Sequence, residues 1–272
     1  AGIYAAPVIG DKTVPQMGFY DPDHGVIPAP EKAKPRPGLD PGPLPDMGRA
    51  FAAGGSGSSP GRGLSTTVQQ SKGPVLVTFY RSYLTAGDTA PVDALIAALR
   101  EAGFQAYGAF AASLKAPGVA AWLGAHLAAH PPVAVINATA FSAKADDGST
   151  PFDGADCPVF QVALSTARRR DWAASDRGLS PADLAMHVVL PEVDGRLFAG
   201  LVSHKSPGKR HPELQFSRFA HRADAGRIQA VVDRVKRWRR LAVTPAADRQ
   251  LAVSLSTDPG RAHQMAHAVG LD

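Results

Sequence analysis

The stretch Val75–Tyr80 (VLVTFY) is a continuous run of apolar, β-branched and aromatic residues, typical of a strand buried on both faces of a sheet. In the next segment, Pro91–Ala102, the apolar residues recur at the spacing of one helical stripe. Pro91 suits the first turn of that helix, and Gly103 ends it. A second strand is predicted at Phe104–Phe110. Strand, helix and strand in this order indicate parallel pairing through a right-handed crossover.

The same alternation continues along the chain. A helix is predicted at Val119–Leu127, and strands at Val133–Asn137 and Val159–Leu164. The pattern predicts an α/β fold, an open and mostly parallel sheet flanked by helices. Ligands of such sheets bind in the loops that leave the carboxyl ends of the strands. The loops that qualify are Arg81–Ala90, Ala138–Cys157 and the segment from Ser165 onward.

The C-terminal half begins with a helix-start motif. Ser180 is a favourable N-cap residue and Pro181 fits the first helical position, so we predict a short helix that ends near His187. Two strands, Val188–Leu190 and Leu197–Ser203, are then predicted to flank a turn at Pro191–Arg196. The remaining predicted elements are a long amphipathic helix around Ile228–Trp238 and a strand at Leu251–Leu255.

Three regions differ in composition. Residues 1–72 are predicted to form a Pro/Gly/Ser-rich arm or linker, in which only Met17–Tyr20 suggests a strand or turn. Residues 73–245 are the predicted α/β domain, and residues 246–272 begin a further α/β unit. The chain has no initiator Met and stops about one element into that unit, so we expect a fragment of a longer protein.

The bulk composition excludes several classes of protein. With 44% hydrophobic and 19% charged residues among 272, the chain suits a globular protein, and it contains neither a membrane-spanning run nor a secretory signal. Its one cysteine, Cys157, cannot form an internal disulfide, as expected in the cytoplasm. The net charge of +5 is a mild excess, and the basic clusters Arg168–Arg170 and Arg234–Arg240 are interpreted as solvated helix faces. RNA-binding signatures are absent, so no nucleic-acid partner is predicted.

The usual catalytic motifs are absent as well. There is no GxxxxGK[ST] phosphate loop and no GxGxxG after a strand, so ATP chemistry would have to come from a partner protein. The nine histidines form no HExxH pattern, and we predict no metal site. A Ser-His-Asp hydrolase lacks its GxSxG nucleophile elbow.

Several blocks of sequence, in register, carry a family resemblance. They are Tyr80-Arg81 with Gly87-Asp88-Thr89 and Pro91, Ser113-Leu114-Lys115, Asn137 with Thr139–Ser142, GLSPADLAMHVVLPEVDGR at Gly178–Arg196, and Val269–Asp272. Over about residues 73–272 the chain resembles the large subunit of the aerobic-pathway cobaltochelatase, and more distantly the porphyrin-binding subunit of magnesium chelatase. It departs from the family pattern at His204, where the family has Phe, and at Thr257-Asp258-Pro259, where the family has Asn-Tyr-Pro.

The resemblance implies insertion of Co2+, the substrate metal, into the corrinoid tetrapyrrole hydrogenobyrinic acid a,c-diamide. ATP would be hydrolysed on AAA+ partner subunits, with accessory chelatase subunits also present. The residues that match the family motifs are then candidates for the site. Glu192 and Asp194 are candidate general bases or transient metal ligands, and His187 is a candidate metal relay. The candidate substrate-binding residues are Arg81, Asp88, Arg196 and Lys205, with Asn137, Thr139 and Ser142 for the ring amides.

Each assignment has a structural alternative. Glu192 and Asp194 could accept backbone hydrogen bonds in a turn, His187 could be a packed helix-end residue, and Arg81 could form an ion pair with Asp88. The protein could also be a non-catalytic module that binds a tetrapyrrole or a partner, or a small-molecule sensor that shares only the fold. The catalytic interpretation requires that Arg81–Asp88, Asn137–Ser142 and Glu192–Arg196 converge on one pocket. The choice between cobalt and magnesium and the oligomeric state stay open.

Overall fold

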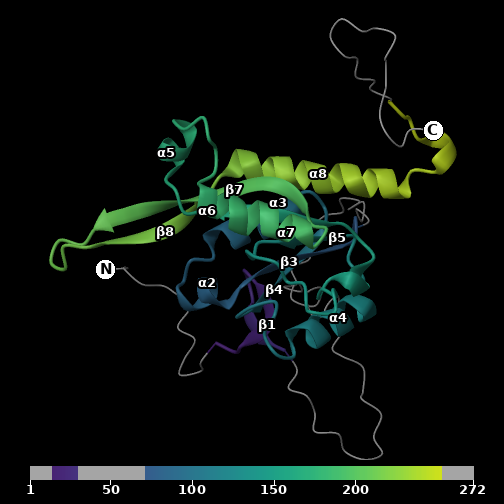
Figure 1. Ribbon diagram of the computed structural model, residues 1–272, viewed down its shortest axis with the longest axis horizontal. Helices are drawn as coiled ribbons and strands as arrows, with labels where there is room; N and C mark the ends of the chain where they lie inside the picture. The colour runs from purple at the N-terminus through teal and green to yellow at the C-terminus, as the bar shows by residue number, and fades with distance from the viewer. Residues whose placement is uncertain (1–13, 30–70, 253–272) are drawn as a thin grey trace, which may run out of the picture. The chain divides into compact units, whose positions relative to one another are not determined.

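The structure is a computed structural model that describes residues 14–29 and 71–252 (Figure 1). Most of the predicted arm at residues 1–72, and most of the unit predicted to begin at residue 246, lie outside the described residues. The chain divides into two compact units, Ala1–Lys236 and Arg237–Asp272. The domain boundary predicted at residue 245 stays a prediction.

An eight-stranded sheet forms the centre of the first unit, in the order β2-β1-β4-β3-β5-β6-β7-β8. The five strands from β4 to β7 are parallel, whereas β1, β2 and β8 pair antiparallel at the two edges. This arrangement confirms the predicted open, mostly parallel sheet. The strands are β1 (Met17–Asp21), β2 (Gly25–Pro28), β3 (Pro74–Tyr80), β4 (Gln105–Ala111), β5 (Ala134–Asn137), β6 (Val159–Ser165), β7 (Leu197–Arg210) and β8 (Ser217–Ala223).

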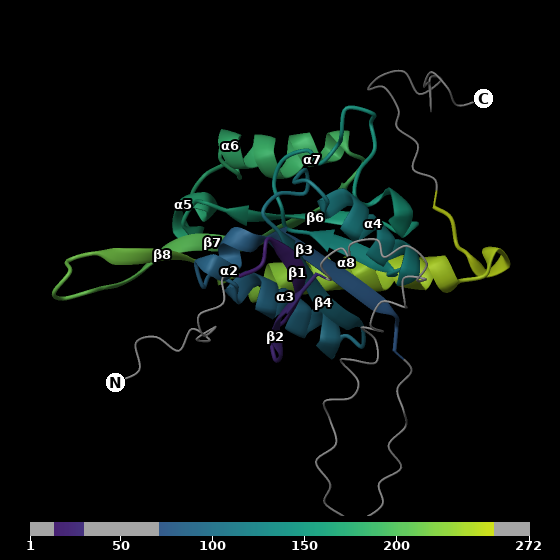
Figure 2. The ribbon, with the colours of Figure 1, turned by 90° about the horizontal axis from the view of Figure 1, so that it is seen from below.

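Helices cover both faces of this sheet (Figures 1 and 2). On one face lie α3 and the first turns of α8, and on the other lie α4, α6 and α7. The helical segments are α2 (Arg81–Thr85), α3 (Ala90–Glu101), α4 (Val119–Ala129), η1 (Asp153–Ala155), α5 (Arg169–Ala173), α6 (Pro181–Leu184), η2 (Ala185–Val189), α7 (Leu190–Val193), α8 (Ala225–Val243) and η3 (Ala246–Asp248).

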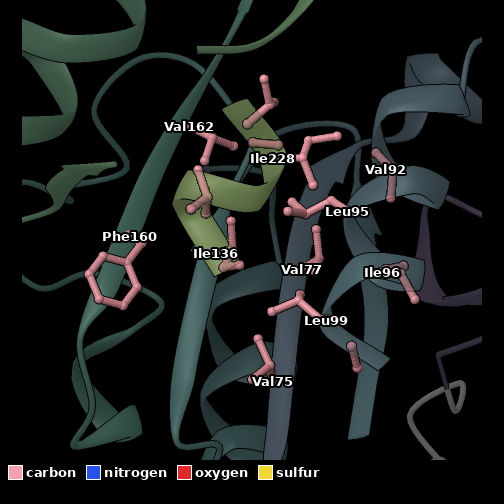
Figure 3. Packing of buried hydrophobic residues seen from close by; sticks show 14 of the residues in the cluster. Val75, Val77, Val92, Leu95, Ile96, Leu99, Ile136, Phe160, Val162 and Ile228 are labelled. Atoms are coloured by element: carbon pink, nitrogen blue, oxygen red, sulfur yellow. The ribbon is translucent and has the colours of Figure 1, made fainter. Parts of the chain in front are cut away.

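The apolar run Val75–Tyr80, predicted to be a strand buried on both faces, lies in β3. Its side chains alternate between two hydrophobic cores, one on each face of the sheet. Val75 and Val77 pack with α3 and α8 (Figure 3), as does Phe79. Leu76 belongs to the second core, with residues of α4. The predicted stripe of α3, including Leu95, is buried in the first core. Since full burial of one such side chain contributes about 1.5–3 kcal/mol, this contact is a principal source of the stability of the fold.

The strand predicted at Val188–Leu190 is wrong. The chain stays helical from Pro181 to Val193, through α6, the π-helical turn η2 and α7. Ser180 caps the start, because its side chain accepts the amide hydrogen of Asp183, as predicted. Pro191 lacks an amide hydrogen and cannot continue a regular ladder of hydrogen bonds, so a new helical segment begins beside it instead of a strand.

Two features of the sheet were not predicted. The strand at Leu197 runs on to Arg210 and turns back as β8, which extends the sheet by an antiparallel strand. At the opposite edge, the β1–β2 hairpin pairs with β4, so that Phe19 lies opposite Ala109. The side chain of Arg81 fixes the chain before this hairpin, since its Nε donates to the carbonyl of Pro15 at 2.8 Å.

Candidate functional site

The polar residues of interest gather where the parallel strands end. Tyr80, Asn137 and Ser165 are the last residues of β3, β5 and β6. Beside them lie two buried groups of polar side chains, here called the Asp194 cluster (Asn137, Thr139, Ser142, Gln161, Asp194, Arg196) and the Asp183 cluster (Asp88, Ser165, Asp183, His187, Ser203, His221). In open α/β sheets this edge is where ligands bind.

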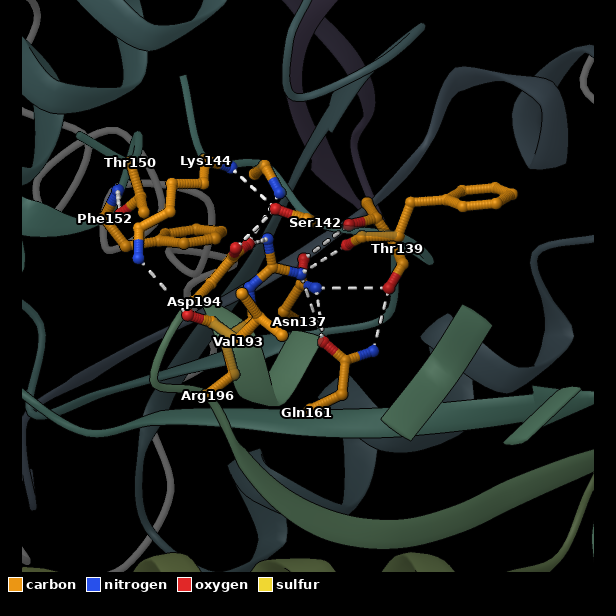
Figure 4. Close-up of polar contacts among 12 residues, drawn as sticks. Asn137, Thr139, Ser142, Lys144, Thr150, Phe152, Gln161, Val193, Asp194 and Arg196 are labelled. Carbon is orange, nitrogen blue, oxygen red and sulfur yellow. Dashed lines mark hydrogen bonds and ion pairs between the residues drawn. The ribbon is translucent and has the colours of Figure 1, made fainter. Parts of the chain in front are cut away.

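Asp194 is the hub of the first cluster (Figure 4). One carboxylate oxygen accepts the Ser142 hydroxyl at 2.5 Å, and the other accepts the Ala143 amide and the Arg196 Nη2, each at 2.6 Å. The side chains of Asp194 and Arg196 are 0% and 1% exposed, so the ion pair is fully removed from water. Asp194 therefore fastens the Asn137–Ser142 loop to the end of the helical run.

Arg196 spans the same cluster. Its Nη1 donates to the Phe141 carbonyl and the Gln161 side-chain oxygen at 3.3 Å, and the guanidinium lies over the Phe152 ring at 5.4 Å. Its Nε has no hydrogen-bond partner within the described structure. Burial lowers the pKa of Arg196, and the Asp194 carboxylate opposes that shift. A buried pair of this kind is costly to break, because the remaining charge would have no counter-ion.

Asn137 connects the cluster to the neighbouring strands β3 and β6. Its Oδ1 accepts the hydroxyl hydrogens of Thr78 and Thr139 at 2.6 and 2.9 Å, and its Nδ2 donates to Gln161 at 2.7 Å. All of these side chains are buried. The amide thus holds the loop after β5 in place, and its hydrogen bonds are made within the protein.

The second cluster is built around Asp183. Its carboxylate accepts the Ser165 hydroxyl at 2.9 Å and the amide and hydroxyl of Thr166 at 3.0 and 3.1 Å. The residue is fully buried at the start of the helical run. It connects the end of β6 to α6, as Asp194 connects the loop after β5 to α7.

Two histidines complete the Asp183 cluster. His187, on the π-helical turn, is 6% exposed and its Nδ1 has no hydrogen-bond partner within the described structure. His221 shares a 3.0 Å hydrogen bond with the Ser203 hydroxyl through its Nδ1, and its backbone amide donates to Asp88 at 2.9 Å. Burial lowers the pKa of both imidazoles, with Asp183 opposing the shift at His187 and Asp88 opposing it at His221. Neutral imidazoles can accept a proton or coordinate a metal ion.

Two tyrosines, at the end of β3 and in α2, also contact residues of this edge. The Tyr80 hydroxyl donates to the Ala140 carbonyl at 2.8 Å and accepts the Ala140 amide at 3.0 Å. The Tyr83 ring meets the His221 ring edge-on at 5.7 Å. Burial, with a smaller contribution from Asp88, raises the pKa of Tyr83 to about 12.

The three segments named from the sequence end at this edge, in different roles. Asn137–Ser142 and Asp194–Arg196 contact each other directly, whereas Arg81–Asp88 reaches the edge through Asp88, and the preceding residue Tyr80 contacts Ala140. Arg81 and Asp88 form no ion pair with each other, because each bonds a different backbone group. Glu192 is exposed on α7, and Lys205 lies partly buried on β7, opposite His221.

A model of the CobN/Magnesium Chelatase family matches residues 8–272. The chain belongs to this family. It is 35% identical to the aerobic cobaltochelatase subunit CobN of a Sinorhizobium species over 72% of its length, and 32% identical to that of Pseudomonas aeruginosa over 73%. It is 28% identical to a magnesium-chelatase subunit of Rhodobacter capsulatus over 68% of its length.

A solved structure of this family supports the fold. The catalytic subunit of cobaltochelatase from Mycobacterium tuberculosis superposes with a TM-score of 0.52 and 29% identity, over 65% of this chain and 15% of that one. The chain spans 16% of the length of each CobN relative. The family resemblance and the α/β fold predicted from the sequence are thereby confirmed.

The side chain of His204 is buried, and both imidazole nitrogens lack a hydrogen-bond partner within the described structure. The ring lies 5.3 Å from that of Trp172, and burial lowers the pKa of His204. The His204 ring thus packs against an aromatic neighbour in the interior of the protein.

Three buried polar residues of this edge were not among the candidates from the sequence. Asp183 lies at the start of a helix, and Gln161 and His221 lie in strands with no recognisable motif. Among the described residues, no three His, Cys, Asp or Glu side chains are grouped so that they could hold a metal ion. No helix in that part of the chain is long and apolar enough to cross a membrane.

Proposed function

We propose that this chain forms the corrinoid-binding segment of a cobaltochelatase large subunit acting in the cytoplasm. The whole subunit would insert Co2+ into hydrogenobyrinic acid a,c-diamide in aerobic cobalamin biosynthesis, while ATP is hydrolysed on AAA+ and accessory partner subunits. The similarity to two aerobic cobaltochelatase subunits supports this proposal. Since the chain covers 16% of the length of those relatives, the complete site would include residues beyond it.

The observation that carries the proposal is the outer face of the helical run. Val189 and Val193, one turn apart, are 50% and 60% exposed, and Phe141, whose amide donates to the Met186 carbonyl, is 50% exposed. Glu192 is exposed next to them. A flat, apolar ring edged with carboxylates and amides needs an apolar surface of this kind to rest on, with polar groups nearby.

Metal insertion requires removal of the ring N–H protons and of water from the cation. Glu192 is the exposed carboxylate of the run, and we assign it the role of general base or transient Co2+ ligand. His187 would relay the metal or a proton, as a buried, neutral imidazole with an unpartnered Nδ1. Asp194 would act through its pair with Arg196 by fixing the helix end that presents Glu192.

The remaining candidates divide by exposure. Lys205 would pair with a peripheral carboxylate of the ring, since its side chain is partly exposed. Arg81, Asp88, Asn137, Thr139 and Ser142, like Arg196, are used in internal hydrogen bonds, and their contribution to substrate binding would be to hold the three loops in position.

The experiment is a titration of the protein with metal-free hydrogenobyrinic acid a,c-diamide, followed by absorbance. Co2+, ATP and the partner subunits are then added and cobalt uptake is measured. We expect Val193→Glu to abolish binding, and Glu192→Gln to retain binding but lose cobalt uptake. Glu101→Gln, an exposed carboxylate at the end of α3, is the matched control and should retain both. Absence of corrinoid binding by the unmodified protein would overturn the proposal.

A second candidate function is a non-catalytic module that binds a tetrapyrrole without metal insertion. It is favoured by the internal hydrogen bonds of Asp194. The carboxylate accepts three of them and has no exposed surface with which to contact a substrate. Corrinoid binding by the unmodified protein, without cobalt uptake when Co2+, ATP and the partner subunits are all present, would identify this function.

A further inference from the structure

The end of the sheet beyond β6 carries a two-stranded extension. The pairing of β6 with β7 ends at Ser165 and His204, whereas β7 and β8 stay paired out to Arg210 and Ser217. Residues 205–222, here called the β7–β8 arm, therefore project from the sheet as a hairpin (Figures 1 and 2). A two-stranded hairpin alone is marginally stable in water, which suggests that another surface covers it.

The arm concentrates positive charge. It contains five cationic residues and one acidic residue, Glu213, a net charge of +4 with His neutral, compared with +5 for the whole chain. Within the described structure none of the five forms an ion pair. Arg168 adds a further cation, because its guanidinium lies over the Phe219 ring at 5.8 Å. The five cationic residues are Lys205, Lys209, Arg210, Arg218 and Arg222.

The same arm exposes large apolar side chains. Leu214, Phe216 and Phe219 are 67%, 54% and 49% exposed. Charged side chains on an edge strand often serve only to prevent sheets from pairing with each other. That explanation covers the cations but not the exposed aromatic rings, which would promote association. Arginine with exposed aromatic residues is the composition of protein–protein interfaces.

We propose that the β7–β8 arm docks on an acidic surface of a partner protein. The apolar side chains at the tip would fill the centre of the interface, and the surrounding Lys and Arg residues would pair with carboxylates of the partner. His221 of the Asp183 cluster lies at the base of the arm. A partner bound at the base would therefore contact the β7–β8 strand pair that carries Ser203 and His221. The choice of partner to be tested rests on the proposed function, which requires ATPase and accessory chelatase subunits.

The test measures binding of those purified subunits to the immobilised chain at increasing NaCl concentration. Lys209→Glu/Arg222→Glu reverses two exposed cations of the arm, and Arg177→Glu/Arg237→Glu is the control with the same change in charge elsewhere. We expect about a tenfold loss of affinity for the arm variant, less than about twofold for the control, and weaker binding at high salt. Circular dichroism and thermal unfolding verify that both variants are folded.

Three results would overturn the proposal: no binding of either subunit to the unmodified chain, equal losses in the two variants, or equally tight binding of a short DNA duplex that the arm variant abolishes. The last result would assign the arm to nucleic acid. Corrinoid binding is measured on the same variants and should not change. A failure of corrinoid binding in the unmodified chain would count against the proposed function and leave the docking result to be judged separately.

Discussion

Replacement of Asp194 by asparagine would remove the negative charge from the centre of the Asp194 cluster while preserving the size of the side chain. Arg196 would then be a buried cation, 1% exposed, with no counter-ion beside it. Loss of one member of a buried ion pair costs about 3–5 kcal/mol. The asparagine oxygen can still accept the two hydrogen bonds that one carboxylate oxygen accepts now, so we expect about 3–4 kcal/mol of destabilisation. That is a large part of the roughly 5–15 kcal/mol by which domains are stable.

Urea unfolding at pH 7, followed by circular dichroism, measures this loss. With a slope of about 2 kcal/mol per molar urea, the midpoint should fall by about 1.5–2 M. Asp146→Asn, an exposed carboxylate in the loop after β5, should change the free energy of unfolding by less than about 0.5 kcal/mol. Arg196→Met added to Asp194→Asn should recover about 1–3 kcal/mol relative to the sum of the two single changes. A stable Asp194→Asn protein with additive effects would refute the buried pair.

Three further predictions concern stability. Burial, and secondarily His130, lowers the pKa of His126 to about 4, so below pH 6.5 the unfolded chain takes up a proton that the folded protein does not. Stability should therefore fall between pH 6.5 and 4, and His126→Gln, which can still bond the Tyr107 hydroxyl, should flatten this slope in urea titrations at several pH values. Leu95→Ala should destabilise the core by about 2–5 kcal/mol in the same assay, and a change below about 1 kcal/mol would contradict the packing of α3 on β3. Gly195 has a φ of +77°, so Gly195→Ala should lower stability by about 1–2 kcal/mol, and an unchanged melting temperature would argue against the left-handed turn that joins Asp194 to Arg196.

The central part of the fold could be predicted because its signals are local. The apolar run of β3 and the stripe of α3 depend on residues within one element, and both were placed within about two residues of their observed bounds. The error at Val188–Leu190 has the opposite cause. Three apolar residues suit a strand or a buried helix equally, and the helical start at Ser180 controls the outcome from outside that window.

The pairing of the edge strands could not be predicted, since it joins segments far apart in the sequence. Only one residue of β8, His221, is buried, so its sequence carries little of the alternation that marks a half-buried strand. The contacts of the candidate site were predictable only in part. Several motif residues lie together at the carboxyl edge of the sheet, as expected for an open α/β fold. The partners of Asp194, however, are Ser142 and Ala143, far earlier in the chain, and no local pattern shows that contact.

The β1–β2 hairpin has a practical consequence for anyone who shortens the protein. Without residues 17–28, the backbone of β4 would be left as a bare border of the sheet, with its amide and carbonyl groups free to recruit β-strands from other molecules. The hairpin is also made long before its partner during translation, because Phe19 is synthesised 90 positions before Ala109. A recombinant protein that begins at residue 71 should therefore aggregate during expression, whereas one that retains residues 14–29 should not.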